Sequence, residues 1–206
     1  SGQHEVAGVF PIGAGYIIVN NREINSLAKA QGVRFGVIDS DQAQYEMIKK
    51  VGAKPVPINI GNMGTKFNSK QVDAMGAPAI AVTAFELHKG MGDKGAIFRF
   101  PVTFVSMNLI VNDKAFPPTF GAKGRRWFAS QTNRMMDVVS RLERAIPEKY
   151  WADLSSNDKV GYIRLMREMR IALINEGVYN KKMTTLLKKV RCQQDPTNFE
   201  CALNEE

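Results

Sequence analysis

The 206-residue sequence contains two cysteines, two histidines and no long hydrophobic run. Its longest apolar segment, residues 96–111, is interrupted by an arginine, a proline and an asparagine, so it does not fit a membrane-spanning helix. His4 and His88 lie far apart and have no Cys or Asp nearby at ligand spacing. These features argue against a membrane span, a metal site and histidine-based catalysis.

Nucleotide-binding and hydrolase motifs are also missing. The chain has no G-x-S-x-G, no Walker loop and no G-x-G-x-x-G, since the segment Gly13–Gly15 lacks the third glycine and its context. We therefore expect neither an enzyme nor a bound cofactor.

Positive charge exceeds negative charge, with 28 Lys and Arg against 20 Asp and Glu and a net charge of +8. The basic residues are spread out, with no run of four. Arg164, Arg167 and Arg170 spread over a helix face that also carries Glu168, without interleaved aromatic residues. This pattern is typical of a solvated basic surface, and we expect no nucleic-acid partner.

The two cysteines, Cys192 and Cys201, stand close together in a polar segment near the end of the sequence. This spacing favours a local disulfide over two unrelated thiols, and a metal site would need two further ligands. Closing a loop of this size would stabilise the fold by about 2.7 kcal/mol on the chain-entropy model. A disulfide would also place the protein outside the cytoplasm.

The first half of the chain alternates strand and helix patterns. Strands are predicted at 15–20, 33–38, 54–59 and around Val72, with helices at 24–30, from Asp39 to Gly52, through Phe67 and at 79–89. This order is typical of an α/β fold with parallel pairing. Two prolines in 54–59 indicate an edge strand or a strand end. Pro101 indicates that a long β segment at 97–111 bends there or lies on an edge.

The second half is predicted to be helical. Apolar residues recur at helical spacing over 125–146, 156–176 and 181–190, with Pro147 and Gly177 ending the first two segments.

Several segments together resemble one protein family. They are NREINSLAKAQG (21–32), VGAKPVP (51–57) and QVD (71–73), followed by the segment 97–118. They resemble TRAP-type solute-binding proteins, which have the type 2 periplasmic-binding fold. The chain is closer still to an uncharacterised solute-binding family with a K-K-V-R-C … E-C ending, here Lys188 to Cys201.

The resemblance implies a mixed α/β fold divided into four parts. Residues 1–32 would belong to a first lobe, 33–92 to a second α/β lobe, 93–118 to a hinge-crossing strand and 119–206 to C-terminal helices with a disulfide-bonded tail. The chain would lack the N-terminal part of the first lobe. It would therefore self-associate or be loosely ordered at its N-terminal end.

The implied function is capture of a small polar or anionic organic solute, such as an organic acid, between two lobes in the periplasm. The implied partners are the solute and membrane permease subunits, without a cofactor. The alternative is a ligand-sensing or partner-docking module of the same fold.

One departure from the family concerns its carboxylate-binding arginine. The family pattern G-x-K-x-R corresponds here to 32–36, so Arg34 takes the lysine position and Gly36 the arginine position. Because residues two apart on a strand share a face, Arg34 could reach the same pocket from an origin roughly 6–7 Å away.

Other candidate ligand-binding residues stand at predicted strand ends. Asp39, Ser40 and Asp41 follow a strand and would suit a hydroxyl, an amine or a cation, or would simply cap the next helix. Asn62 either caps a short helix or faces the ligand.

Two further pairs complete the predicted site. Ala77 and Pro78 end a strand where small side chains would admit a ligand or would form an ordinary turn, and the family commonly has Asn in place of Ala77. Arg99 and Thr103 lie on the predicted long strand, where a surface ion pair is the alternative role for Arg99.

Overall fold

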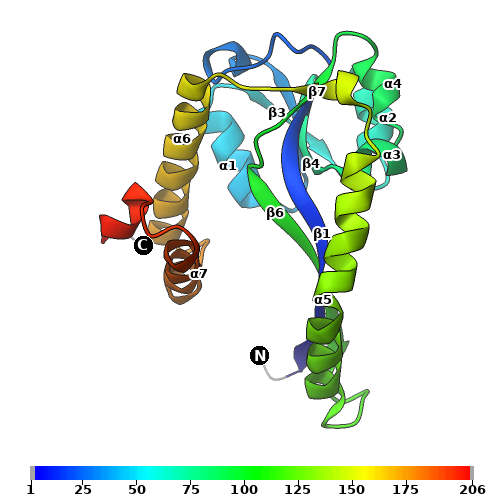
Figure 1. Ribbon diagram of the computed structural model, residues 1–206, viewed down its shortest axis with the longest axis vertical. Helices are drawn as coiled ribbons and strands as arrows, with labels where there is room; N and C mark the ends of the chain where they lie inside the picture. The colour runs from blue at the N-terminus through cyan, green and yellow to red at the C-terminus, as the bar shows by residue number, and fades with distance from the viewer. Residues whose placement is uncertain (1–2, 205–206) are drawn as a thin grey trace.

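The computed structural model describes residues 3–204 and shows a mixed seven-stranded sheet with helices on both faces (Figure 1). The strand order is β3-β2-β4-β1-β5-β7, and β6 also pairs with β1. The strands are β1 (His4–Val19), β2 (Arg34–Ile38), β3 (Lys54–Ile58), β4 (Ala74–Pro78), β5 (Ala96–Phe98), β6 (Thr103–Asn112) and β7 (Trp151–Ala152).

In the described part of the chain, seven α-helices and three short 3-10 helices connect or follow the strands. The α-helices are α1 (Gln42–Lys50), α2 (Met63–Asn68), α3 (Ile80–Ala84), α4 (His88–Met91), α5 (Phe120–Arg144), α6 (Ser156–Asn175) and α7 (Lys181–Gln194). The 3-10 helices are η1 (Ala28–Ala30), η2 (Glu148–Tyr150) and η3 (Phe199–Ala202).

Strands β2, β3 and β4 form a parallel unit, as predicted, with β2 between the other two. The prediction was wrong for the strand at 15–20, which extends back to His4 as β1 and pairs antiparallel with β4. β3 is an edge strand, which leaves the positions of Pro55 and Pro57 without a second neighbour to bond. Each face of the sheet buries its own apolar cluster. One cluster includes Phe67 of α2 and Val82 of α3, and the other includes Ile48 of α1 and Tyr162 of α6.

β1 is the strand that joins the two ends of the sheet. Its carboxyl half pairs antiparallel with β4 and β5, whereas residues 4–15 pair with β6 in a long antiparallel ladder. We call residues 4–14 of β1 together with β6 the ribbon. The ladder shifts register twice, between Val6 and Gly8 and between Pro11 and Gly13. These shifts are bulges that bend and twist the ribbon.

α5 packs along the ribbon (Figure 1), and small residues allow the close approach. A Cβ on Gly8 would lie 2.2 Å from the ring of Phe128, and one on Gly124 would lie 2.4 Å from the carbonyl oxygen of Ala7. The rest of the ribbon is poorly covered within the described residues. Its exposed large apolar side chains are Val6, Val9, Phe104, Met107, Leu109 and Ile110.

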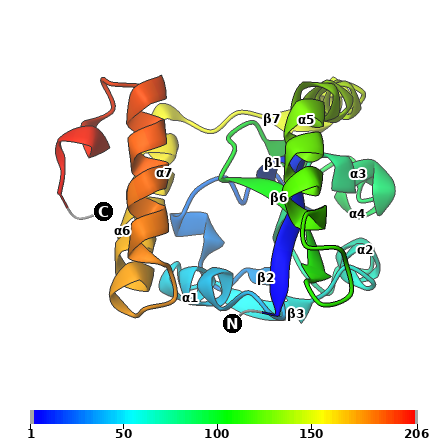
Figure 2. The same ribbon diagram turned by 90° about the horizontal axis from the view of Figure 1, so that it is seen from below.

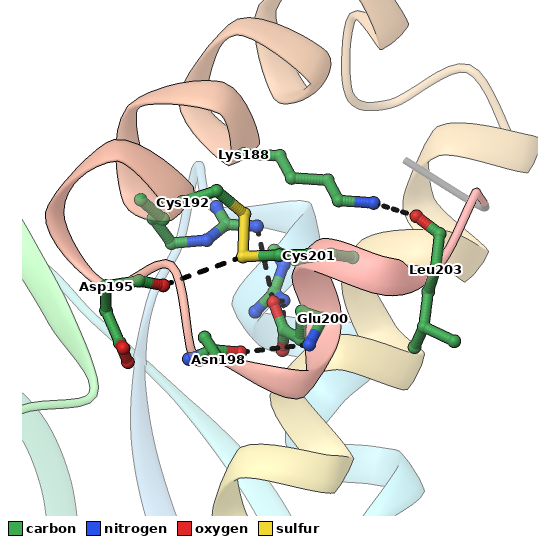
Figure 3. Close-up of polar contacts among 9 residues, drawn as sticks. Lys188, Cys192, Asp195, Asn198, Glu200, Cys201 and Leu203 are labelled. Atoms are coloured by element: carbon green, nitrogen blue, oxygen red, sulfur yellow. Dashed lines mark hydrogen bonds and ion pairs between the residues drawn. A yellow bond between two sulfur atoms is a disulfide. The ribbon is translucent and has the colours of Figure 1, made fainter.

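The C-terminal helices α6 and α7 lie side by side, on the opposite side of the molecule from α5 (Figures 1 and 2). Ser155 caps α6 through the backbone N–H of Asp158, and Asn180 caps α7 through that of Met183. The predicted disulfide is confirmed: the Cys192 and Cys201 sulfurs are 2.01 Å apart. The bond ties η3 back to α7 (Figure 3).

A buried carboxylate strengthens the same junction (Figure 3). Glu200 accepts hydrogen bonds from the guanidinium of Arg170 at 2.7 and 2.9 Å and from that of Arg191 at 3.4 Å. One acidic side chain therefore links α6, α7 and the tail. Charge-assisted bonds to a shielded carboxylate are stronger than neutral ones.

Several predicted boundaries were wrong, each for a local reason. The helix predicted at 24–30 is only the turn η1, because the side chains of Asn21 and Ser26 bond nearby backbone N–H groups instead. The helix predicted at 79–89 is two helices, because Glu86 adopts a positive φ of 51° between them.

The strand predicted around Val72 begins later, as β4. The predicted long segment 97–111 is two strands, β5 and β6, separated at the prolyl residue Pro101, which has no N–H to bond. α5 also begins five residues before its predicted start, and α7 continues four residues beyond its predicted end. Across residues 3–204, no helix is both long and apolar enough to span a membrane.

Candidate functional site

The three parallel strands β2, β3 and β4 end at the same edge of the sheet, which we call the carboxyl edge. The backbone N–H of Asp39 donates to the carbonyl of Ile58 at 3.0 Å, so the loops after β2 and β3 meet directly. In open α/β sheets, ligands bind in the crevice outside the carboxyl ends of the strands. The candidate site therefore lies at the carboxyl edge.

The loop after β2 brings Asp39, Ser40 and Asp41 to this edge. Asp41 caps α1, because its carboxylate accepts from the backbone N–H of Gln44 at 2.9 Å. The Gln44 side chain in turn accepts from the N–H of Ile38 at 3.0 Å. Asp39 and Ser40 are exposed, and no side-chain bond to either occurs within residues 3–204. These two are the groups of the loop that remain available to a ligand.

The loop after β3 holds Asn62 through a reciprocal pair of bonds. The Asn62 side chain accepts from the N–H of Asn59 at 2.9 Å, and the Asn59 side chain accepts from the N–H of Asn62 at 3.1 Å. These bonds use the side-chain oxygens, so the NH₂ groups of both side chains remain available as donors. Ile60, between them, is 73% exposed, which is unusual for its type. Sequence reasoning missed Asn59 and Ile60, although an Asn directly after an apolar strand was a usable signal.

Ala77, Pro78 and Thr103 come together through β1. Gly15 lies opposite Pro78 on one side and opposite Thr103 on the other. A Cβ on Gly15 would lie 2.6 Å from the Thr103 methyl group, so a larger residue there would force the exposed Thr103 side chain to move. Ala77 is buried, whereas Thr103 is exposed, so only the threonine presents its side chain freely.

Arg34 is not brought together with these residues. It begins β2, five residues and roughly 16 Å before Asp39. Its guanidinium forms a fork with the Asp73 carboxylate, with N–O distances of 2.7 and 2.8 Å. These hydrogen bonds hold the pKa of Asp73 below its usual range. At Gly36, two residues further along β2, a Cβ would lie 3.0 Å from the Ile58 side chain, so a larger residue would require that side chain to shift.

Arg99, directly after β5, also has its charge engaged. It pairs with Glu148, lies 3.9 Å from an oxygen of Asp153 and stacks over the Trp151 ring at 5.2 Å from the centroid. The ion-pair alternative described above therefore fits the geometry of Arg99.

Beside Arg99 lies Tyr16, another residue that sequence reasoning missed. Its ring packs edge-on against Trp151 at 5.2 Å, and its hydroxyl donates to Glu143 at 2.9 Å. Burial, followed by the bond to Glu143, raises the pKa of Tyr16 to about 12. The hydroxyl is thus a fixed neutral donor that joins β1 to α5.

The carboxyl edge does not coincide with either of two cavities elsewhere. One, of about 380 Å³, lies between the ribbon and α5 and is lined mainly by apolar groups such as Val9, Phe104 and Phe128. The other, of about 360 Å³, lies near Arg22 and Lys94. Within residues 3–204, no cluster of His, Cys, Asp and Glu could hold a metal ion.

The architecture is that of TRAP periplasmic solute-binding proteins, as predicted. A galacturonate-bound TRAP periplasmic solute-binding protein from Xanthobacter autotrophicus Py2 superimposes with a TM-score of 0.73 at 14% identity, covering 92% of this chain and 63% of that one. The periplasmic ectoine-binding protein of the TeaABC TRAP transporter from Halomonas elongata gives 0.68 at 11% identity, covering 84% and 59%. These likenesses establish the fold.

Sequence comparison places the chain more narrowly. All residues, 1–206, match the family described as Solute-binding protein AdeT 1/2, and the chain belongs to that family. Probable solute-binding protein AdeT1 from Acinetobacter baumannii is 47% identical over 205 residues, which cover 100% of this chain and 67% of AdeT1. The chain thus spans about two thirds of AdeT1 and less than two thirds of the two TRAP proteins.

Proposed function

We propose that this protein captures a small polar or anionic organic solute in the periplasm and delivers it to a TRAP-like membrane permease. The observation that carries the proposal is the match of the whole chain to a solute-binding family. The TRAP fold supports it, because the galacturonate- and ectoine-binding proteins share this arrangement of strands. We expect no catalysis, consistent with a family and fold of binding proteins.

We place the solute at the carboxyl edge. Asp39 and Ser40 supply an acceptor and a hydroxyl without an internal partner, the amides of Asn59 and Asn62 supply donors, and Thr103 faces the same region from β6. Such a set suits the hydroxyl, amide and amine groups of a polar organic molecule. The four-part division of the chain and the two-lobed closure remain part of this proposal.

The charged groups of the protein determine which charge of solute the carboxyl edge favours. Arg34 is forked onto Asp73, and Arg99 is paired with Glu148, so neither guanidinium is directed at a ligand in this arrangement. An anionic solute at this edge would have to displace Glu148 from Arg99 or bind through neutral donors. Hydroxyl and amine groups would instead meet the free carboxylate of Asp39.

Isothermal titration with sugar acids, other organic acids, polyols and zwitterions tests the proposal. At least one class should bind, and Asp39→Asn should change its affinity about tenfold or more, as expected for a charge-assisted bond. The affinity should fall for hydroxyl or amine ligands and rise for anions. Asp93→Asn is the matched control, because Asp93 is exposed and lines the cavity near Arg22. Equal affinities in both variants would remove the carboxyl edge from the proposal.

A further inference from the structure

Helix α7 turns a polar side toward the protein and an apolar side toward solvent. Its buried residue is Thr184, whose hydroxyl donates to the carbonyl of Lys181 at 2.9 Å. Four apolar residues at i, i+3, i+4 and i+7 form one face, which we call the α7 stripe. Its members and their exposed fractions are Met183 (54%), Leu186 (53%), Leu187 (50%) and Val190 (46%). An amphipathic helix of a globular protein normally buries such a face.

The described part of the C-terminal tail, up to residue 204, is attached to a side of the helix other than the α7 stripe. Figure 3 shows this attachment. Thr184, Lys188 and Arg191 also share a face, about 120° around the helix from the stripe. On that face Lys188 bonds the carbonyl of Leu203, and Arg191 bonds Glu200. The disulfide through Cys192 secures the same attachment. Within residues 3–204, the tail is therefore held away from the α7 stripe, whose side chains stay about half exposed.

Positive charge accompanies the α7 stripe. Between residues 181 and 194 the helix carries four lysines and one arginine but no acidic residue. Lys182 and Lys189 are one heptad apart and flank the stripe on one side. Neither amine has a hydrogen-bond or ion-pair partner in the part of the chain that the structure describes. The surface is thus a half-exposed apolar row beside a cationic row.

The charge and shape of this surface indicate which kind of partner would cover the α7 stripe. A second copy packed stripe to stripe would bring cationic helices together, which is unfavourable. A protein groove is usually anchored by aromatic residues or arginine, whereas the stripe contains only aliphatic side chains and methionine. A bilayer needs only an apolar face of this width and cations at headgroup level.

We propose that α7 docks on an anionic phospholipid bilayer. The α7 stripe enters the boundary between headgroups and acyl chains, and Lys182 and Lys189 extend to the lipid phosphates. Figures 1 and 2 show α7 at the periphery of the molecule, away from the sheet. Docking would hold the protein at the membrane independently of the solute.

Vesicle binding with a site-specific probe tests the orientation. In a background in which the native Trp127 and Trp151 are replaced by Phe, Leu187→Trp should show a blue-shifted emission and quenching by brominated lipid when vesicles of phosphatidylglycerol and phosphatidylcholine are added. Thr185→Trp is the matched control, because residue 185 is exposed but lies outside the α7 stripe. Equal shifts at the two positions, or no shift at 187, would overturn the proposed orientation.

Co-sedimentation with the same vesicles tests the charges. Lys182→Gln with Lys189→Gln should weaken partitioning about 30-fold, because each lysine near an anionic surface contributes about a factor of five. Lys54→Gln with Lys123→Gln removes the same net charge elsewhere and should have a much smaller effect. Leu186→Ser with Leu187→Ser should also abolish most binding. Equal losses in the two lysine pairs would indicate attraction by net charge alone and overturn the proposal. So would wild-type self-association that the serine variant removes.

Discussion

The two halves of β1 belong to one continuous strand but lie in different surroundings. In the carboxyl half, Ile18 and Val19 are fully buried between neighbouring strands and helices on both faces. In the amino half, Val6 and Val9 are 40% and 48% exposed, although the strand pairing continues through β6. Backbone pairing therefore does not by itself produce a buried core; layers on both faces do.

The carboxyl half of β1 thus belongs to a well-packed unit, whereas the amino half belongs to a ribbon that depends on α5 for cover. Within residues 3–204, α5 is the helix that covers part of the ribbon. The exposed apolar residues of the ribbon form a surface that favours association. We therefore expect the stability of the protein to reside around the carboxyl half of β1. The following changes test that expectation.

The largest effect should come from truncating the core. Phe98→Ala removes a ring that is 1% exposed and should lower the free energy of unfolding by about 3–5 kcal/mol. Phe104→Ala, in the ribbon, removes a ring that is 57% exposed and should change it by about 0.5 kcal/mol or less. Urea unfolding measures both. Similar losses in the two variants would show that the ribbon is as tightly packed as the sheet.

Loss of the disulfide should have the next largest effect. Cys192→Ser with Cys201→Ser should cost about 2.7 kcal/mol on the chain-entropy model for a loop of about ten residues. The loss should be local, so hydrogen exchange should accelerate in α7 and η3 but not in β2–β4. Faster exchange throughout the sheet would instead mean that the tail supports the whole fold.

A smaller effect should follow from breaking the fork between Arg34 and Asp73. Asp73→Asn should destabilise the protein at neutral pH, where the carboxylate is ionised. Because the folded-state pKa of Asp73 is lowered, its contribution is present above the unfolded value of about 3.9 and is lost as pH falls through the folded value. The stability difference from wild type, measured by urea unfolding, should therefore shrink below pH 4.

The fork also separates two roles for Arg34. Arg34→Ala should reduce stability but leave solute affinity unchanged, since its guanidinium is bonded at the end of β2 opposite the carboxyl edge. A weakened solute affinity in a folded variant would return Arg34 to the binding site.

The smallest effect should appear only at high pH. The folded-state pKa of Tyr16 is raised to about 12, so its contribution is present below the unfolded value of about 10 and lost as pH rises toward 12. Tyr16→Phe should therefore reduce the loss of stability between pH 10 and 12. Unfolding measured over this range checks it, with Tyr150→Phe as a control at a partly buried tyrosine in the same cluster.

Sequence patterns predicted the parallel unit well because its signals are local. Alternating apolar residues, the glycines after helices and the prolines of an edge strand all act within a few residues. The disulfide was also predictable, since Cys192 and Cys201 are the two cysteines of the sequence and stand close together in it.

Long-range pairing could not be predicted in the same way. Nothing near Gly15 indicates that Pro78 and Thr103 will flank it, because those contacts join residues more than 60 positions apart. The engagement of Arg34 was hidden for the same reason, since its partner Asp73 lies 39 positions away. The sequence shows that Arg34 can bind an anion, but only the fold shows that Asp73 already occupies its guanidinium.

The antiparallel pairing of β1 has a consequence for the order of folding during synthesis. β1 leaves the ribosome before its partners β4, β5 and β6, which follow about 60 to 110 residues later. Its apolar residues must therefore wait unpaired while the rest of the sheet is made, and non-local pairing of this kind is slow and prone to aggregation. During synthesis β1 is therefore the strand that stays exposed to association longest, until β6 has been made and can pair with it.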